Sequence, residues 1–365
     1  MPFRIIRIIA LVLVAPTLLL GGCDLAGGLT PETDGPAIGF EAGSYLLRDD
    51  ATKSADLLEG TDFAINQRID VFGRYHNDME DVLLFDGIEV EKQNASSWRY
   101  NPPLRFWEWE SISDYYDFLG VYPTDKGSVM QIPGYLAVEA PYSIVRPGNI
   151  RGDDYDLLMA GYRRKGNVHN PNAVVPLNFR HALSAVRVVV FNESKDTDIQ
   201  LDSYAFQHII VNASAKITIN ALGEPEISWI NSQRNTSVIA TAIRGEAPDE
   251  TLYAKNHEGS HIHTGDFDFF VPADLSETSN GSSSTDYMPH LILKYTPSGG
   301  QQVTKGILLK DIQQSDKSFI DTWQPGVKYI YYIGIRLDGG VRVTVITTEW
   351  DSVDAETQGL LIHLN

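Results

Sequence analysis

The chain has 365 residues, a single cysteine and a formal net charge of −19 at pH 7. So acidic a chain argues against binding to nucleic acid or to an anionic lipid surface, because both would repel it. Aromatic residues make up 10%, there are 30 glycines and 18 prolines, and long helical patterns are missing, which is typical of an all-β protein with many turns.

The first 22 residues have the features of an export signal. Arg4 and Arg7 give a positive start, and the mainly apolar stretch 5–20 is shorter than the about 20 apolar residues that a membrane span needs. It ends in Gly21-Gly22-Cys23, small residues before a cysteine, which resembles the lipobox cut by lipoprotein signal peptidase. The sequence therefore predicts a signal peptide over 1–22 and a lipid, palmitate included, on Cys23. The alternative is a secretory peptide that is cleaved elsewhere, with Cys23 incidental.

The mature chain is long enough for more than one domain. Residues 23–36 are rich in glycine, proline and threonine, which predicts a flexible tether. About 340 residues remain after the signal peptide, more than one hydrophobic core usually supports. We therefore expect two β-sandwich domains, one over 37–175 and one over 176–365.

Period-2 alternation marks the first strand of the N-terminal part. Over 38–47, Ile38, Phe40, Ala42 and Leu46 share one face, as in a half-buried strand. A short helix is predicted over 52–59. Turn residues separate the further predicted strands, which cover 69–75, 82–85, 97–100, 115–122 and 156–162.

A second group of strands begins near Val175. The clearest pattern is at the end of the chain, where apolar residues alternate over 329–335 and 341–345 around the turn Asp338-Gly339-Gly340, which predicts a hairpin. The other strands predicted in this part cover 177–183, 186–191, 207–211, 216–220, 266–271, 290–295 and 302–309.

Several short motifs occur in an order and spacing that resemble a known family. They are Ile38-x-Phe40, Ile69-Asp70-Val71-Phe72-Gly73, Trp98-Arg99-Tyr100, Tyr116-Asp117-Phe118, Phe179-Arg180-His181-Ala182-Leu183-Ser184 and Trp323-Gln324-Pro325-Gly326. In this the chain is similar to the Mfa-like branch of the fimbrillin family, the lipoprotein-derived subunits of type V pili of Gram-negative anaerobes. The resemblance implies two transthyretin-like β-sandwich domains in tandem, and a structural and adhesive role in a surface pilus.

The resemblance also implies assembly by donor-strand exchange. A trypsin-like protease would cut after an arginine beyond the first strand, so that the plug strand with Ile38, Phe40, Ala42 and Leu46 leaves and a strand of another subunit takes its place. The arginine directly after this strand is Arg48. Because Asp49 and Asp50 follow it and acidic residues disfavour such cleavage, Arg68 and an uncut anchor subunit stay open as alternatives.

The end of the chain offers a candidate donor strand, in which Leu360, Ile362 and Leu364 alternate with Leu361 and His363 up to Asn365. The alternative is an ordinary last strand of the second domain. The expected partners are other pilus subunits, the membrane through the lipid on Cys23, and host or bacterial surface receptors. The expected location is the outer membrane and cell surface, or the fimbrium after processing.

Two side-chain groups could bind a ligand. His257, His261 and His263, with Asp266 beyond, have the spacing of a metal site, but they fall in a loop, and we expect neither a metal nor another cofactor. An aromatic-rich stretch could stack on sugar rings or fill a core, and we favour the core. Its members are Trp98, Trp107, Trp109, Tyr115 and Tyr116.

No catalytic motif is present. The sequence has no Gly-x-Ser-x-Gly elbow, no phosphate-binding loop and no His-Glu-x-x-His helix, so we expect no catalytic residues and no enzyme activity. The tripeptide Arg151-Gly152-Asp153 matches an integrin-recognition motif, although three-residue matches are common by chance. The alternative to a pilus subunit is a monomeric surface lipoprotein that binds glycans.

Overall fold

The structure is a computed structural model that describes residues 37–44, 63–77, 81–95, 97–107, 113–144, 155–165, 174–234, 250–265, 267–278, 281, 283–314, 317–336 and 340–350. Within these ranges the chain consists of β-strands and two short 3-10 helices, Thr285–Tyr287 and Leu309–Asp311, without an α-helix, which confirms the predicted all-β class. In the same ranges, no helix has the length and apolar character needed to cross a membrane. The chain from Pro36 onward forms one compact unit.

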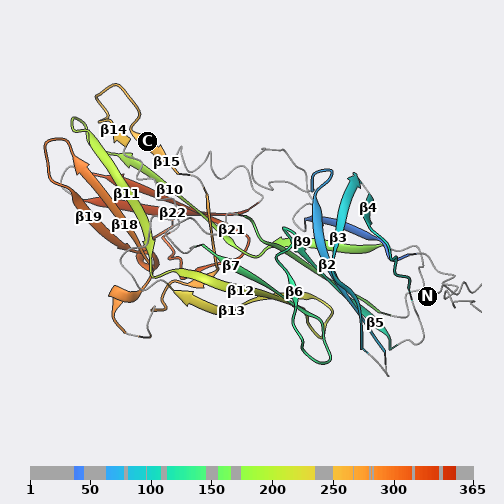
Figure 1. Ribbon diagram of the computed structural model, residues 1–365. Coiled ribbons are helices and arrows are strands. Elements are labelled where there is room, and N and C mark those ends of the chain that lie inside the picture. The colour runs from blue at the N-terminus through green and yellow to red at the C-terminus, as the bar shows by residue number, and fades with distance from the viewer. Residues whose placement is uncertain are drawn as a thin grey trace, which may run out of the picture. The chain divides into compact units, whose positions relative to one another are not determined.

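The N-terminal strands form a seven-stranded sheet with the order β1-β9-β8-β5-β2-β3-β4 (Figure 1). Every neighbouring pair in it is antiparallel except β1 and β9, which are parallel. Strands β4 and β5 have the bounds predicted from the sequence. The predicted domain boundary at 175/176 falls inside β9. The division into two domains stays a prediction. The strands are β1 (Phe40–Ser44), β2 (Arg68–His76), β3 (Asp81–Asn94), β4 (Ser97–Tyr100), β5 (Tyr115–Tyr122), β8 (Leu158–Lys165) and β9 (Val175–His181).

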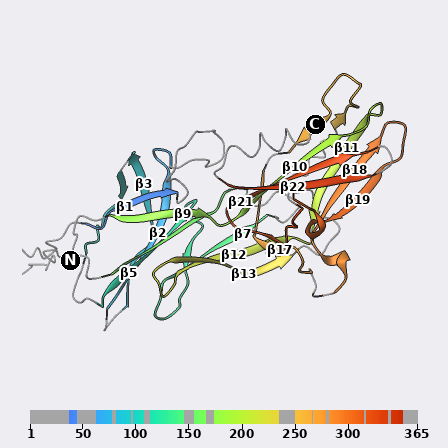
Figure 2. The ribbon, with the colours of Figure 1, turned by 180° about the vertical axis from the view of Figure 1, so that it is seen from behind.

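A four-stranded sheet combines strands from both halves of the sequence. Its order is β13-β12-β7-β6, and β12 lies between β7 and β13 (Figure 2). Since β7 precedes β9 in the chain and β12 follows it, their antiparallel pairing joins the two halves. The strands are β6 (Ser128–Val129), β7 (Ala137–Ser143), β12 (Ile210–Ile219) and β13 (Pro225–Arg234).

The remaining strands form a five-stranded, a four-stranded and a two-stranded sheet. The predicted C-terminal hairpin is confirmed, because β21 and β22 pair antiparallel from Val327 opposite Glu349 to Ile335 opposite Val341. The five-stranded sheet holds β10 (Ser184–Asn192), β15 (Ile262–Thr264), β16 (Asp268–Phe270), β21 (Val327–Ile335) and β22 (Val341–Glu349). The others hold β11 (Ile199–Gln207), β14 (Glu250–Leu252), β18 (His290–Pro297) and β19 (Val303–Leu308), and β17 (Ala273–Asp274) with β20 (Thr322–Trp323).

Some predicted strands differ from the observed ones. The strand predicted over 207–211 is wrong, because the backbone turns at His208, whose φ is 59°, so that β11 ends before it and β12 begins after it. Strands β7 and β13 were not predicted. Pro141 interrupts the pattern of the first, and much of the second is exposed. The helix predicted over 52–59 lies outside the described residues.

The seven-stranded sheet has an apolar core on each face. Because successive residues of a strand point to opposite sides, Tyr116 and Phe118 of β5 face one core, while Leu119 and Val121 face the other. The first core contains residues of this sheet and of the segments beside it, including all three buried residues of the β1 region. The second core continues into the other large sheets.

Gly161 in β8 lies against the β12–β13 hairpin of the four-stranded sheet. A Cβ atom on it would lie 2.7 Å from Cδ1 of Ile219 and 2.8 Å from Cβ of Pro225. Both contacts are shorter than van der Waals distance, so any side chain here pushes the β12–β13 hairpin away.

Gly161→Ala is expected to lower the free energy of unfolding by about 1–3 kcal/mol, the usual effect of overpacking. Gly306→Ala is a matched control in the edge strand β19, since its Cβ would lie 3.4 Å from the nearest side-chain atom. Urea unfolding followed by circular dichroism measures both. Equal losses in the two variants would contradict the close approach at Gly161.

Asp70 is a buried carboxylate in β2, 4% exposed, and Oδ2 accepts a hydrogen bond of 2.7 Å from the backbone N–H of Asp125. Burial raises the pKa of Asp70 to about 6, and the hydrogen bond from Asp125 opposes this shift. At pH values between the pKa of a free aspartate and about 6, Asp70 is therefore protonated in the folded state and ionised in the unfolded state. Stability from this group falls as pH rises through that window and stays lower above it.

Asp70→Asn keeps an oxygen that can accept from Asp125 and removes the titration. We expect the variant to be more stable than the native chain at pH 7.5, with the difference shrinking as pH falls from 6 toward 4, in denaturant unfolding at several pH values. Asp86→Asn, at an exposed position of β3, is the control and should show no such trend. A stability difference for Asp70→Asn that is the same at all pH values would rule out the buried ionisation.

Candidate functional site

Strand β1 is one of the two edge strands of the seven-stranded sheet, and its neighbour in the sheet, β9, is distant from it in sequence. It runs parallel to β9, with Phe40 opposite Val175 and Ala42 opposite Leu177. Just before it, the Ile38 N–H donates a hydrogen bond of 2.8 Å to the carbonyl of Arg105, in the segment after β4. Among the described strands of this sheet, β1 makes the one parallel pairing, and Phe40 of β1 contacts Tyr100 of β4, the strand at the opposite end of the sheet.

The inward face of the β1 region is apolar and fully covered. Ile38, Phe40 and Ala42 are 0%, 3% and 5% exposed, while Glu41 between them is exposed. All three belong to the first core and none to the second. A short segment at the start of the described chain thus supplies one wall of a core that later strands build.

Phe40 fills an aromatic socket. Its ring meets those of Phe85, Tyr100 and Phe118 edge to face, with centroids 5.5, 5.8 and 5.9 Å away. These residues come from β3, β4 and β5, so a single side chain of the edge strand contacts three strands of the sheet. Such edge-to-face pairs contribute about 0.5–1.5 kcal/mol each beyond the burial of apolar area.

Phe63 packs on Phe179 near the end of β9. Its side chain is 5% exposed, and its ring lies 5.1 Å from Phe179, 5.4 Å from Tyr122 and 5.5 Å from Trp98, again edge to face. The groove that β1 occupies, called the β1 groove below, is lined by β9 and the aromatic socket, and Phe63 belongs to the same core.

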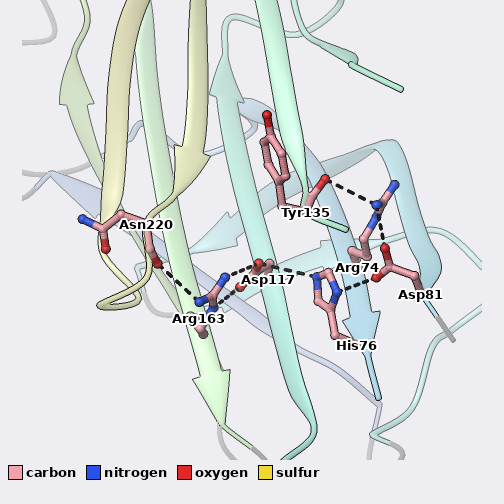
Figure 3. Close-up of polar contacts among 7 residues, drawn as sticks. All are labelled: Arg74, His76, Asp81, Asp117, Tyr135, Arg163 and Asn220. Carbon is pink, nitrogen blue, oxygen red and sulfur yellow. Dashed lines mark hydrogen bonds and ion pairs between the residues drawn. The ribbon is translucent and has the colours of Figure 1, made fainter. Parts of the chain in front are cut away.

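A network of charged side chains, called the charged chain below, crosses the face of the same sheet that lies opposite to the β1 groove (Figure 3). Asp117, which is 1% exposed, accepts two hydrogen bonds from Arg163, of 2.6 and 2.7 Å. On its other side, Nε2 of His76 lies 3.6 Å from the Asp117 carboxylate, and Nδ1 of His76 contacts Asp81. Arg74 completes the chain with an ion pair of 3.1 Å to Asp81.

The two arginines of this charged chain also bind the backbone of neighbouring segments. Arg163 donates a hydrogen bond of 3.3 Å to the carbonyl of Asn220, at the β12–β13 turn, and Arg74 donates one of 3.3 Å to the carbonyl of Tyr135, before β7. The hydrogen bonds to Asp117 raise the pKa of Arg163. Two arginines and two aspartates balance in formal charge, and together they hold β2, β3, β5 and β8 against the four-stranded sheet without using any residue of β1.

The charged chain was missed in the sequence analysis because its members come from four strands. Asp117 gave a local signal, since it is the one charged residue in the apolar strand 115–122. A buried charge in such a strand requires a partner, but the sequence does not identify Arg163 as that partner.

Of the predicted processing and donor residues, Arg68 is the one that the structure describes. Arg68 lies at the start of β2, paired in register with Glu91, and its guanidinium binds Glu89 at 3.1 Å and Glu91 at 2.9 Å. These two carboxylates raise its pKa. The other predicted sites lie outside the described residues, namely Cys23, Leu46, Arg48, the tripeptide 151–153, Leu360, Ile362 and Leu364.

The aromatic stretch belongs mainly to the core, as favoured from the sequence. Trp107 and Tyr116 are buried, and their rings pack edge to face at 5.0 Å. Trp98 is partly buried against Phe63, and Tyr115 stacks on His76 at 4.2 Å. Because Trp107 and Tyr116 are buried, they leave little aromatic surface for a sugar. Trp109 lies outside the described residues.

The histidines of the proposed metal motif bind different carboxylates. His257 lies 2.7 Å from Asp198, and His263 lies 2.6 Å from Glu250. In the part of the chain that the structure describes, no three histidine, cysteine or acidic side chains are grouped as a metal ion would require. Asp266 lies outside that part.

Several solved structures are similar to this chain. A candidate cell-adhesion protein from Bacteroides uniformis is 17% identical, with 87% of this chain and 99% of that chain covered and a TM-score of 0.43. A fimbrial protein from Bacteroides vulgatus is 13% identical, with 77% and 92% covered and a TM-score of 0.45. A candidate cell-adhesion protein from Bacteroides eggerthii is 12% identical, with 87% and 96% covered and a TM-score of 0.45.

No curated protein matches the chain. The fimbrillin-like family matches residues 52–350, which include every strand described above except β1. Because this match covers well over half of the sequence, the chain belongs to the fimbrillin-like family.

Proposed function

We propose that this chain is a structural and adhesive subunit of a bacterial surface pilus, made as a lipoprotein and assembled by donor-strand exchange at the β1 groove. Membership of the fimbrillin-like family supports a pilus-subunit role at the cell surface, structural and not enzymatic. The observation that carries the strand-exchange mechanism is β1 itself, a short parallel edge strand whose inward side chains fill a socket built by other strands.

Removal of β1 would leave a surface that needs a new strand. The backbone groups of β9 that face β1 would lose their hydrogen-bond partners, and the socket of Phe40 would open to water. Exposing one such buried side chain costs about 1.5–3 kcal/mol, and unpaired strand edges attract other strands. An incoming strand with alternating apolar residues restores both kinds of contact.

The remainder of the sheet is held independently of β1. The charged chain from Arg74 to Arg163 lies on the opposite face and ties the sheet to β7 and to the β12–β13 turn. We therefore expect the groove to keep its shape while it exchanges one strand for another.

Release of the plug strand requires a cut between β1 and β2. Arg48 follows the last residue of β1 by four positions, whereas Arg68 is already part of β2 and binds two glutamates of β3. A protease needs an extended, unpaired segment in its active site, which argues against Arg68 and leaves Arg48 as the proposed site. An uncut subunit would keep the lipid on Cys23 and serve as an anchor in the outer membrane.

The candidate donor strand follows a fixed point at the end of β22. The Trp350 N–H donates a hydrogen bond of 3.0 Å to the carbonyl of Gly326, and its indole stacks on the His181 ring at 4.3 Å. Residues 351–365 continue from there and carry Leu360, Ile362 and Leu364. The proposed donor segment therefore begins directly after a residue that the fold holds in place.

Processing predicts a new N-terminus. In cell-surface fractions, mass spectrometry should find a chain that starts at Asp49, and unheated SDS gels should show heat-sensitive high-mass species that contain it. Arg48→Gln should abolish both, whereas Arg68→Gln, the matched control, should change neither. An intact lipidated Cys23 without high-mass species would favour an anchor subunit or the alternative, a monomeric glycan-binding lipoprotein.

The donor role of the tail is tested by deleting residues 359–365. We expect a monomer with native circular dichroism and an unchanged melting temperature that no longer enters the high-mass species. A truncated chain that misfolds would show instead that these residues form an ordinary last strand of the fold.

A further inference from the structure

We infer that the β1 groove accepts a strand from a different subunit, with an aromatic residue between a large aliphatic and a small residue on its inward face, and not the tail of a second copy of this chain. This inference rests on the proposed strand exchange and identifies its partner. The sequence Ile38-x-Phe40-x-Ala42, which fills the groove, shows which side chains the groove fits.

The central position of the groove requires an aromatic ring. Phe40 is 3% exposed and touches three rings edge to face, at centroid distances from 5.5 to 5.9 Å. Edge-to-face contacts depend on a ring, so an aliphatic side chain would leave both a void and three aromatic neighbours without their partner.

The next inward position requires a small residue. Ala42 is 5% exposed and lies opposite Leu177 of β9. The side chains of Leu177 and Phe179 already fill the space above Gly120, where a Cβ atom would lie 3.3 Å from Cδ1 of Leu177 and 2.7 Å from Cζ of Phe179. Ala42, Leu177, Phe179 and Phe63 belong to the same packed core, so a leucine in place of Ala42 would have to displace neighbouring side chains of that core.

The tail of this chain does not match these requirements. Residues 351–365 contain no phenylalanine, tyrosine or tryptophan, so no register of the tail places such a ring in the socket. The apolar face of the tail carries large residues at Leu360, Ile362 and Leu364. The other face would bury the polar groups of His363 and Asn365 among aromatic rings without partners, which is costly.

Donor and acceptor of this chain are therefore complementary to different partners. The tail, with three aliphatic residues in alternation, fits a groove with aliphatic subsites, and the β1 groove fits an aromatic residue followed by a small one. A chain of this kind joins unlike subunits and does not form a long homopolymer.

A cut form of the full chain tests the choice of strand. A viral-protease recognition sequence replaces residues 48–54, so that cutting leaves all strands present but frees β1 to exchange. A fluorescent peptide with the sequence of residues 36–47 is then bound to the cut chain, and unlabelled peptides compete for the groove in fluorescence anisotropy. The melting temperature before and after the cut checks that the fold is retained.

The peptide of residues 36–47 should compete best. The same peptide with Phe40→Leu or Ala42→Leu, and the tail peptide of residues 354–365, should each compete at least about tenfold less well. The tail peptide with Ile362→Phe and Leu364→Ala reproduces the required pattern and should recover most of this loss.

The outcomes separate the two proposals. If the unmodified tail peptide competes within about threefold of the peptide of residues 36–47, the groove does not select against a second copy and the inference is wrong, while strand exchange stands. If the labelled peptide of residues 36–47 never enters the cut chain, strand exchange itself fails and the proposed function falls with it.

Discussion

The parallel pairing of β1 with β9 is the contact on which the N-terminal part of this protein depends. Without it, the seven-stranded sheet would end in an open edge beside an apolar core, an arrangement that soluble proteins avoid. One aromatic residue, Phe40, connects this edge strand to three other strands. The closure of the first core is therefore concentrated in very few residues.

The two faces of the same sheet have different roles. Neighbouring residues Asp117 and Phe118 of β5 illustrate this, because the carboxylate of the first binds Arg163 on one face while the ring of the second lines the socket of Phe40 on the other. Charged contacts with fixed directions set the position of the sheet, and apolar contacts hold the edge strand β1. A buried ion pair contributes little net stability because desolvation offsets its attraction, and under the proposed strand exchange the fixed directions of these contacts would keep the groove in shape.

Much of the N-terminal sheet could be predicted from local pattern. The strands over 97–100 and 115–122 have the predicted bounds, and the alternation around Phe40 matches the observed burial. Local pattern failed where the chain departs from it. The left-handed turn at His208 divides an apolar run into two strands. Pro141 is tolerated within β7 because it pairs with β12 on one side and has no partner in β6 on the other. The charged chain and the shape of the Phe40 socket depend on residues distant in sequence, which pattern analysis of one sequence cannot pair.

The origin of the closing strand has a consequence for the order of folding. Phe40 pairs with Val175 across well over a hundred intervening residues, whereas β2 with β3 and β21 with β22 are local hairpins. Contacts of long sequence separation carry a larger loop-closure entropy and tend to form late. Strand β1 is synthesised before the other strands of this sheet and is thus expected to take its place in it last. If the chain is processed as proposed, its groove is vacant during that interval just as it is after the cut, so that folding and assembly would compete for a single surface.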